Sequence, residues 1–207
     1  MPAGGGRRKA VRKPRQKRSQ ATVAAIIAAG ARILGRDGWE GFTTNAVAER
    51  AGVSIGSLYE YFRNKQALLD AIADDHIGRG EQLQAHAAGL VASRRELKDL
   101  VDMLVDGAIA LHADDPALHR VLSSEVPLGK SVRARVVRLR AGFVAIVQEA
   151  LSGRFPAPHV AAQLLVDVTD AIIHRWWIDD DGRPTDPQRL ADELKLMLLA
   201  YLKQPER

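Results

Sequence analysis

Three aromatic side chains lie within four residues of one another in the stretch AGVSIGSLYEYFRNK, residues 51–65, although aromatic residues make up only 5% of the chain. The hydroxyls of Tyr59 and Tyr61 sit on rigid rings, and each can reach a phosphate without the entropy cost of a long side chain. Lys65 adds a positive charge that attracts phosphate. Phe62 has no polar atom, and we expect it to pack inside the turn. The pattern indicates contact with a nucleic-acid backbone; the competing interpretation places all three rings in the core of a small bundle.

The segment around these residues predicts two short helices joined by a tight turn. Thr44 can cap the first helix and Ser54 the second, because both types of hydroxyl accept backbone N–H groups. Gly52 stands where a left-handed backbone would turn the chain at little steric cost. Ala48 is small enough for the two helices to cross closely. This order is the helix-turn-helix pattern, which holds its second helix out to enter the major groove of DNA.

The charge of the chain is unevenly distributed. Residues 1–65 contain 13 Lys and Arg against 4 Asp and Glu, whereas residues 66–207 contain 17 against 21. A basic head on a mildly acidic body indicates a polyanion-binding head. Residues 1–18 lack any periodic pattern, and we expect a disordered basic tail. The eight positive charges within residues 7–18 could act as a non-specific electrostatic tether or as an arm that follows the minor groove.

Composition excludes several classes of protein. The chain has no cysteine, which excludes disulfides, thiolate zinc sites and a cysteine nucleophile. No apolar run approaches the roughly 18 residues of a membrane-spanning helix, and the basic N-terminus lacks the apolar segment of a secretory signal. We therefore expect a cytoplasmic protein with no membrane partner.

No spacing typical of a catalytic or metal site is found. The chain contains no glycine-rich phosphate loop, no nucleophile motif and no paired carboxylates. The histidines show no metal-ligand spacing, so we expect no enzyme activity, no cofactor and no metal; they stand at positions 76, 86, 112, 119, 159 and 174. Asp170 and His174 lie four residues apart and can pair on one helical face.

Apolar residues recur at three- and four-residue steps along most of the chain, which predicts an all-α fold of about nine helices. The first helix is expected from Ser19, as its N-cap, to a stop at Asp37-Gly38. Asn64 and Ser93 are expected to cap the helices that follow the helix-turn-helix. Later helices are expected at about residues 130–154, 159–179 and 187–203.

The stretch FTTNAVAERAGVSIGSLYEYFRNKQALLDAI resembles the N-terminal domain of the TetR family of transcriptional regulators, and the resemblance covers about residues 19–80. It implies an all-α homodimer that binds double-stranded DNA. Residues 19–65 would form a three-helix DNA-binding domain. Residues 66–207 would form a larger helical domain that binds a small-molecule effector and holds the dimer together.

The resemblance also assigns DNA contacts. Thr44 would contact phosphate at the start of the second helix, and Tyr59, Tyr61 and Lys65 would lie along the backbone. Sequence would be read by side chains facing the groove, by contacts with thymine methyl groups and by DNA shape. The DNA-binding candidates are Thr43, Thr44, Asn45, Ser54, Ile55, Gly56, Ser57, Tyr59, Tyr61 and Lys65.

The effector cavity and the dimer interface are less sharply determined by the sequence, because each apolar candidate could instead be ordinary core. The cavity candidates are Met103, Gly107, Phe143, Val147, Thr169, Ile173, His174 and Trp177. The apolar stripes of the last two helices predict a four-helix dimer interface. Its candidates are Leu165, Val168, Ile172, Trp176, Leu194, Met197, Leu198 and Tyr201.

The function expected from these features is a ligand-responsive transcriptional regulator, in the repressing mode. A homodimer would bind a palindromic operator and be released by a small apolar molecule. The alternative is a helical small-molecule-binding or interaction module that has only non-specific affinity for DNA.

Overall fold

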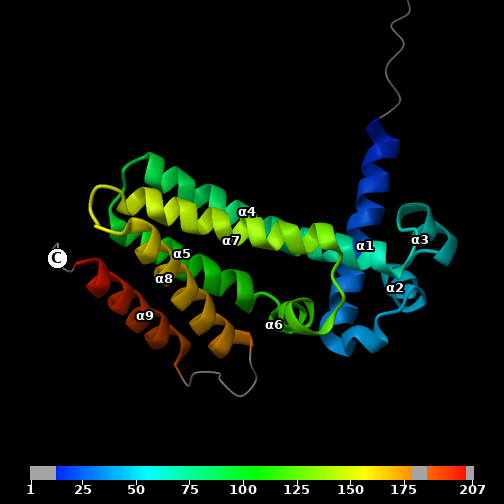
Figure 1. The fold of residues 1–207 in the computed structure, drawn as a ribbon. Coiled ribbons are helices and arrows are strands. Elements are labelled where there is room, and N and C mark those ends of the chain that lie inside the picture. Colours follow the sequence, from blue (N-terminus) through cyan, green and yellow to red (C-terminus); the bar gives the residue numbers. More distant parts are fainter. Residues whose placement is uncertain (1–12, 179–185, 204–207) are drawn as a thin grey trace, which may run out of the picture.

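The computed structural model describes residues 13–178 and 186–203, with side chains from 18–176 and 186–203. Over these ranges the chain is built from helices and contains no strand, which confirms the predicted all-α fold (Figure 1). Two five-residue π-helical turns, η1 (Val121–Glu125) and η2 (His174–Ile178), interrupt the α-helical pattern. The α-helices are α1 (Lys13–Gly41), α2 (Thr44–Ala51), α3 (Ile55–Tyr61), α4 (Lys65–Ala92), α5 (Leu97–Ala113), α6 (Pro116–Arg120), α7 (Lys130–Leu151), α8 (Pro158–Ile173) and α9 (Pro187–Leu202).

The three N-terminal helices form a small head around one apolar core. Ile26 and Leu34 of α1, Val47 of α2 and Leu58 of α3 are all fully buried there. Phe42, in the short link between α1 and α2, is also fully buried. The core continues into the first half of α4, so the head and α4 pack as one unit.

The turn between α2 and α3 has the geometry that the sequence predicts. Gly52 adopts the left-handed conformation, with φ 68° and ψ 30°. Its N–H donates to the Glu49 carbonyl at 3.1 Å, and the N–H of Val53 donates to the Ala48 carbonyl at 3.0 Å. The side chain of Ala48 is buried where the helices meet. The helix-turn-helix prediction is therefore confirmed, including the reason for its glycine.

Several predicted helix boundaries differ from the structure. Helix α1 begins at Lys13, six residues before the expected N-cap Ser19. The predicted stop at Asp37-Gly38 is present as a break in the helical backbone, with φ 67° and ψ −167° at Gly38, before a last short turn that ends at Gly41. Ser93 ends α4 and does not begin α5. The basic side chains between 13 and 17 fit a helix as well as a tail, which is why composition misplaced this start. Residues 1–12 of the predicted tail lie outside the described residues.

The N-cap of α2 is Thr43 and not Thr44. Thr43 has the extended backbone of a cap residue, and its hydroxyl accepts the Ala46 N–H at 3.2 Å. Thr44 is already helical, and its hydroxyl is directed to Tyr59. Two adjacent threonines are equivalent by type, so only the backbone conformation distinguishes them.

This assignment makes a testable prediction. The substitution Thr43→Ala is expected to lower the free energy of unfolding by about 1 kcal/mol, because it removes the cap hydrogen bond. The matched substitution Thr44→Ala should cost less than about 0.5 kcal/mol. Urea unfolding of both variants at one protein concentration measures the two losses. A larger loss for Thr44→Ala would contradict the assignment.

The body of the protein is organised around α4, which packs against α1, α5 and α7. Helices α5, α8 and α9 share a second apolar core with the C-terminal half of α7. The guanidinium of Arg135 on α7 binds both carboxylate oxygens of Glu81 on α4, at 2.6 and 2.7 Å, and reaches Asp74 at 2.8 Å. This bidentate pairing fixes the register of α7 along α4.

A search of the described residues for a helix that is both long and apolar enough to cross a membrane finds none.

Candidate functional site

Helix α3 lies at the outer edge of the head, and one of its faces is open to solvent (Figure 1). Ile55, Tyr59 and Tyr61 are 39%, 49% and 37% exposed, whereas Leu58 is buried. Phe62 is also buried, as expected from its lack of a polar atom. The exposed rings are therefore not core residues of a bundle. A helix held in this way can present its outer surface to a groove.

The predicted phosphate contacts from α2 and α3 lie together at one edge of this surface. The hydroxyls of Thr44 and Tyr59 share a hydrogen bond of 3.1 Å. This bond joins the start of α2 to the middle of α3 and fixes the direction of the Tyr59 ring. One of the two hydroxyls donates this bond, so the other keeps its hydrogen for a phosphate oxygen, because each hydroxyl has one hydrogen and two lone pairs.

Ser54 and Ser57 divide the tasks of capping and surface contact. The Ser54 hydroxyl accepts the Ser57 N–H at 3.0 Å and donates to the Ser57 hydroxyl at 3.0 Å. Ser54 is thus engaged within the protein as the N-cap of α3. The Ser57 hydroxyl accepts from Ser54, so its own hydrogen remains available to a partner outside the protein. Asn45 and Gly56 are exposed beside them.

Lys65 is held by the protein itself, which the sequence did not indicate. Its ammonium donates to the Trp39 carbonyl at 3.0 Å and lies 3.7 Å from the centre of the Trp39 ring. The side chain is half-buried, and desolvation lowers the pKa of its ammonium. One of three N–H donors is occupied, so Lys65 anchors the start of α4 to the end of α1 and keeps two donors for another partner.

A cavity of about 640 Å³ opens in the body between α4, α5, α7 and α8. Five of the predicted cavity residues line it: Phe143, Val147, Thr169, Ile173 and His174. The lining is mostly aliphatic. Its few polar side chains include Arg133, Arg140 and Asp170. An apolar cavity with a few polar groups is typical of a small-molecule site.

The other three predicted cavity residues do not line it. Met103 is half-buried in α5 but is not among the lining residues. Gly107 allows α5 to cross α4 closely, since an added Cβ would lie 2.2 Å from the Leu83 side chain. The side chain of Trp177 lies outside the described residues.

The sequence predicts the apolar residues that form the aliphatic wall of the cavity, but it does not predict that they face a cavity. Leu100, Val101 and Leu104 of α5 line it together with Leu139 of α7. Their spacing predicts a buried stripe, which is correct. A stripe that faces a cavity and a stripe that faces packed side chains have the same periodicity, so no sequence signal separates them.

Four histidines gather at one end of the cavity, although no two of them have metal-ligand spacing in the sequence. The Nε2 atom of His76 lies 2.8 Å from Nδ1 of His119, and Nε2 of His119 lies 3.3 Å from Nε2 of His174. His112 approaches the ring of His119 with a centroid distance of 4.3 Å. The four come from α4, α5, α6 and η2, so only the tertiary fold brings them together.

Burial keeps three of these four imidazoles neutral, those of His76, His112 and His119. Desolvation, with the neighbouring imidazoles, lowers the pKa of His119 to about 2. Desolvation likewise lowers the pKa of His76 and that of His112. The rings of His76, His112 and His119 therefore each carry one N–H and one lone pair at neutral pH. The predicted pairing of Asp170 with His174 is present at 3.6 Å.

The head and the body each match a known protein-family model. A model described as bacterial regulatory proteins of the tetR family matches residues 26–72, which covers the head and the start of α4. A second, described as the tetracyclin repressor-like C-terminal domain, matches residues 96–202, about half of the chain. The chain belongs to the TetR family. Its head matches the domain of bacterial regulatory proteins, and its helical body matches the domain described as tetracyclin repressor-like.

Individual relatives agree with this assignment. The DNA-binding transcriptional repressor TetR of Mycobacteroides abscessus is 28% identical over 188 residues, covering 88% of this chain and 96% of the relative. Tetracycline repressor protein class C of Escherichia coli is 48% identical over 50 residues, which is 24% of this chain and 23% of the relative. The fatty acid degradation regulator FadR of Bacillus halodurans has the same fold, with a TM-score of 0.67, 20% identity and coverage of 89% and 97%.

The relatives differ in how much of their own length this chain matches. The chain spans only about a quarter of the length of the tetracycline repressors, 23% for class C and 30% for class D. The repressor of Mycobacteroides abscessus matches with lower identity, 28%, but over 96% of its own length.

The predicted dimer residues of this TetR-family chain divide into three groups by burial. Leu165, Leu194 and Leu198 are buried in the core of their own protomer, so they cannot offer a free face. Among the predicted set, Met197 is the exposed residue, at 48%. The others are partly buried: Val168, Ile172, Trp176 and Tyr201.

Other apolar residues of α8 and α9, outside the predicted set, are exposed. Val160 and Leu164 of α8 are exposed, and so is Leu196 of α9, at 63%. Apart from Met197, the predicted interface residues lie on the buried or partly buried sides of these helices, and the helices that form the interface stay a prediction. Both stripes of an amphipathic helix that is covered on two sides are apolar, so hydropathy alone does not tell them apart.

Proposed function

We propose that this regulator is a cytoplasmic homodimeric repressor that binds a palindromic operator and is released when a small apolar molecule enters the cavity. The observation that carries this proposal is that one helix, α4, belongs to both sites. Its first residue, Lys65, is bound to the head through Trp39. Ala73, His76, Ile77 and Gly80, further along the same helix, line the cavity.

Helix α4 can therefore couple the two sites. Its N-terminal half is part of the core of the head, with Leu68, Leu69 and Ile72 buried against α1 and α2. A ligand that fits the cavity only after α4 has shifted also moves α3. In a dimer, a small rotation of each head changes the distance between the two reading helices, which must match one turn of DNA, about 34–36 Å. DNA affinity and ligand affinity are then reciprocally coupled.

The walls of the cavity indicate the kind of ligand. Aliphatic side chains from α5 and α7 favour an apolar body. Thr169 offers a hydroxyl, and Arg133 offers a positive charge at the cavity wall. A volume of about 640 Å³ suits a drug-sized molecule. The proposed effector is an apolar molecule that carries one polar or anionic group.

The experiment is a fluorescence-anisotropy titration of the full chain with the DNA that flanks its own gene, at physiological salt. A specific regulator binds that DNA at least about 1,000-fold more tightly than a scrambled duplex. Apolar compounds found in a thermal-shift screen should then release it. Equal, steeply salt-dependent affinity for both duplexes would instead support the alternative, a module with non-specific DNA affinity.

A further inference from the structure

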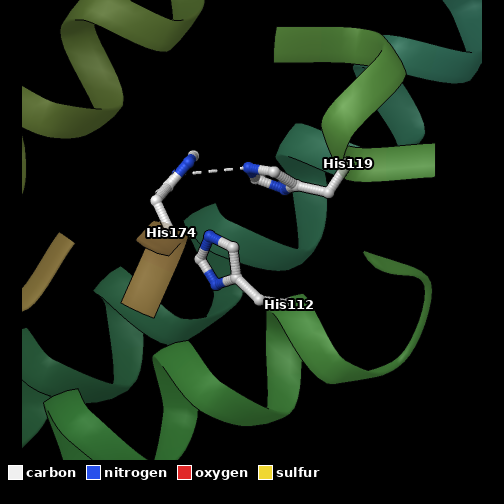
Figure 2. A group of neighbouring side chains, drawn as sticks. All are labelled: His112, His119 and His174. Atoms are coloured by element: carbon white, nitrogen blue, oxygen red, sulfur yellow. Dashed lines mark hydrogen bonds between the residues drawn. The ribbon is translucent and has the colours of Figure 1, made fainter. Parts of the chain in front are cut away.

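We propose that His112, His119 and His174 form a binding site for one divalent transition-metal ion of the zinc class at the wall of the cavity (Figure 2). The three rings converge from α5, α6 and η2, and each residue lines the cavity. One ligand nitrogen from each ring can be chosen so that all three lie within 4.8 Å of one another. This site is separate from the DNA-binding surface and goes beyond the proposed regulation.

The distance between two of the rings fits a single ion directly, and His112 would complete the set by closing a separation of up to 4.8 Å. Two imidazole nitrogens that each bind zinc at about 2.0–2.1 Å, at a tetrahedral angle, are about 3.3–3.4 Å apart. The Nε2 atoms of His119 and His174 are 3.3 Å apart. The third ring, His112, lies beside both, with centroid distances of 4.3 Å to His119 and 5.0 Å to His174.

Hydrogen bonds behind the cluster orient two of the rings as ligands. Nδ1 of His112 lies 2.6 Å from the Ala108 carbonyl, so this nitrogen carries the proton and Nε2 carries the lone pair. Nδ1 of His119 lies 2.8 Å from Nε2 of His76. When Nδ1 of His119 donates to that neighbour, Nε2 of His119 is free to bind an ion. A ligating histidine usually has such a second partner, which fixes its tautomer.

The ligand set indicates the class of ion. Three neutral imidazoles suit zinc, cobalt, nickel or copper, whereas magnesium and calcium prefer oxygen ligands. Three protein ligands leave a fourth position, as in open zinc sites. The Asp170 carboxylate, 3.6 Å from Nε2 of His174, lies beside this position and adds negative charge. A water molecule or a donor atom of a cavity ligand completes the coordination.

A different arrangement of the same atoms makes a rival prediction. His76 could donate to His119 and His119 to His174, which would form a chain of neutral hydrogen-bonded imidazoles without an ion. In that arrangement Nε2 of His119 is protonated and has no lone pair for a metal. The two arrangements differ in whether the protein binds an ion stoichiometrically.

The test uses the full chain, purified without a polyhistidine tag and stripped with a chelator, and titrates it with Co²⁺. We expect one equivalent per chain, with the visible absorption of a four- or five-coordinate ion, and displacement by Zn²⁺. His174→Gln should abolish this absorption. His76→Phe, which removes only the partner behind His119, should weaken binding about 10- to 100-fold. His159→Gln, an exposed histidine on α8, is the matched control and should bind as the wild type does.

Each outcome decides the proposal. Sub-stoichiometric binding, or binding that survives His174→Gln and His119→Gln, overturns it and supports the hydrogen-bonded chain. Circular dichroism shows whether a variant is folded. If His119→Gln is unfolded, His174→Gln alone decides, because the side chain of His174 is 34% exposed and its replacement disturbs the core less. The readout needs neither DNA nor an effector, so its failure would leave the proposed repressor function untouched.

Discussion

The substitution Ile55→Glu is expected to weaken binding to the proposed operator at least about 100-fold, without lowering the stability of the free protein. Ile55 is the first residue of α3 and is 39% exposed on the outer surface of the head. A carboxylate there would face DNA phosphates, and like charges brought together cost several kcal/mol. Each 1.4 kcal/mol is a factor of about 10 in the dissociation constant.

The free protein should tolerate this change. The first turn of α3 contains no acidic residue, and a carboxylate at a helix N-terminus interacts favourably with the helix dipole. Thermal unfolding should therefore be unchanged or slightly raised. Gln82→Glu adds the same charge to an exposed position on α4 and is the matched control, with an expected loss of less than threefold. Retained affinity in Ile55→Glu would remove α3 from the DNA interface.

The sequence was sufficient to predict the head because its local signals agree with one another. A left-handed turn at Gly52, a small side chain at Ala48 and a cap at Ser54 each act over a few residues. Such signals do not depend on which distant helix lies nearby. The cap of α2 was displaced by a single residue because Thr43 and Thr44 are equivalent in type.

The contact of Lys65 with Trp39 could not be predicted from local sequence signals. The spacing of Tyr59, Tyr61 and Lys65 predicts three backbone contacts. The structure keeps both rings exposed but binds the ammonium of Lys65 to Trp39, which is 26 residues earlier. A contact of this kind depends on how α1 and α4 cross. It has no periodic signature in either segment.

The histidine cluster could not be predicted for the same reason. Metal sites are recognised in sequences when two ligands stand within one or two turns of each other. His112, His119 and His174 each come from a different element, and His76 comes from a fourth. The break at Pro116 and the η2 turn determine where these side chains come together. Neither feature produces a recognisable spacing of histidines in the sequence. The absence of a sequence motif was therefore no evidence against a site.

The proposed dimer requires an apolar face that the protomer leaves uncovered. Helices α8 and α9 both pack on α5, and both contribute to the same core. On their outer sides, Leu164 is 46% exposed and Leu196 is 63% exposed. Exposed large apolar side chains on two neighbouring elements mark an interaction site more often than a free surface. A two-fold axis through this face would build the proposed four-helix interface from one stripe used twice.

The double substitution Leu164→Glu with Leu196→Glu is expected to convert the dimer to a folded monomer, because four unpaired charges would be buried in the interface. Sedimentation at micromolar concentration should show a single species at the mass of one chain, 22.6 kDa. Operator affinity should fall at least about 100-fold, since a monomer reads one half-site and loses the gain from linked binding.

The control for this double substitution is Gln82→Glu with Gln148→Glu, which places the same added charge on exposed positions of α4 and α7. It should stay dimeric and bind DNA with nearly unchanged affinity. If the leucine variant also remained a dimer, the interface would lie elsewhere, and the exposed stripe of α8 and α9 would need another partner. If it became a monomer but kept its operator affinity, the pairing of two heads on one palindrome would be wrong. Only loss of both properties links the C-terminal helices to DNA reading through the dimer.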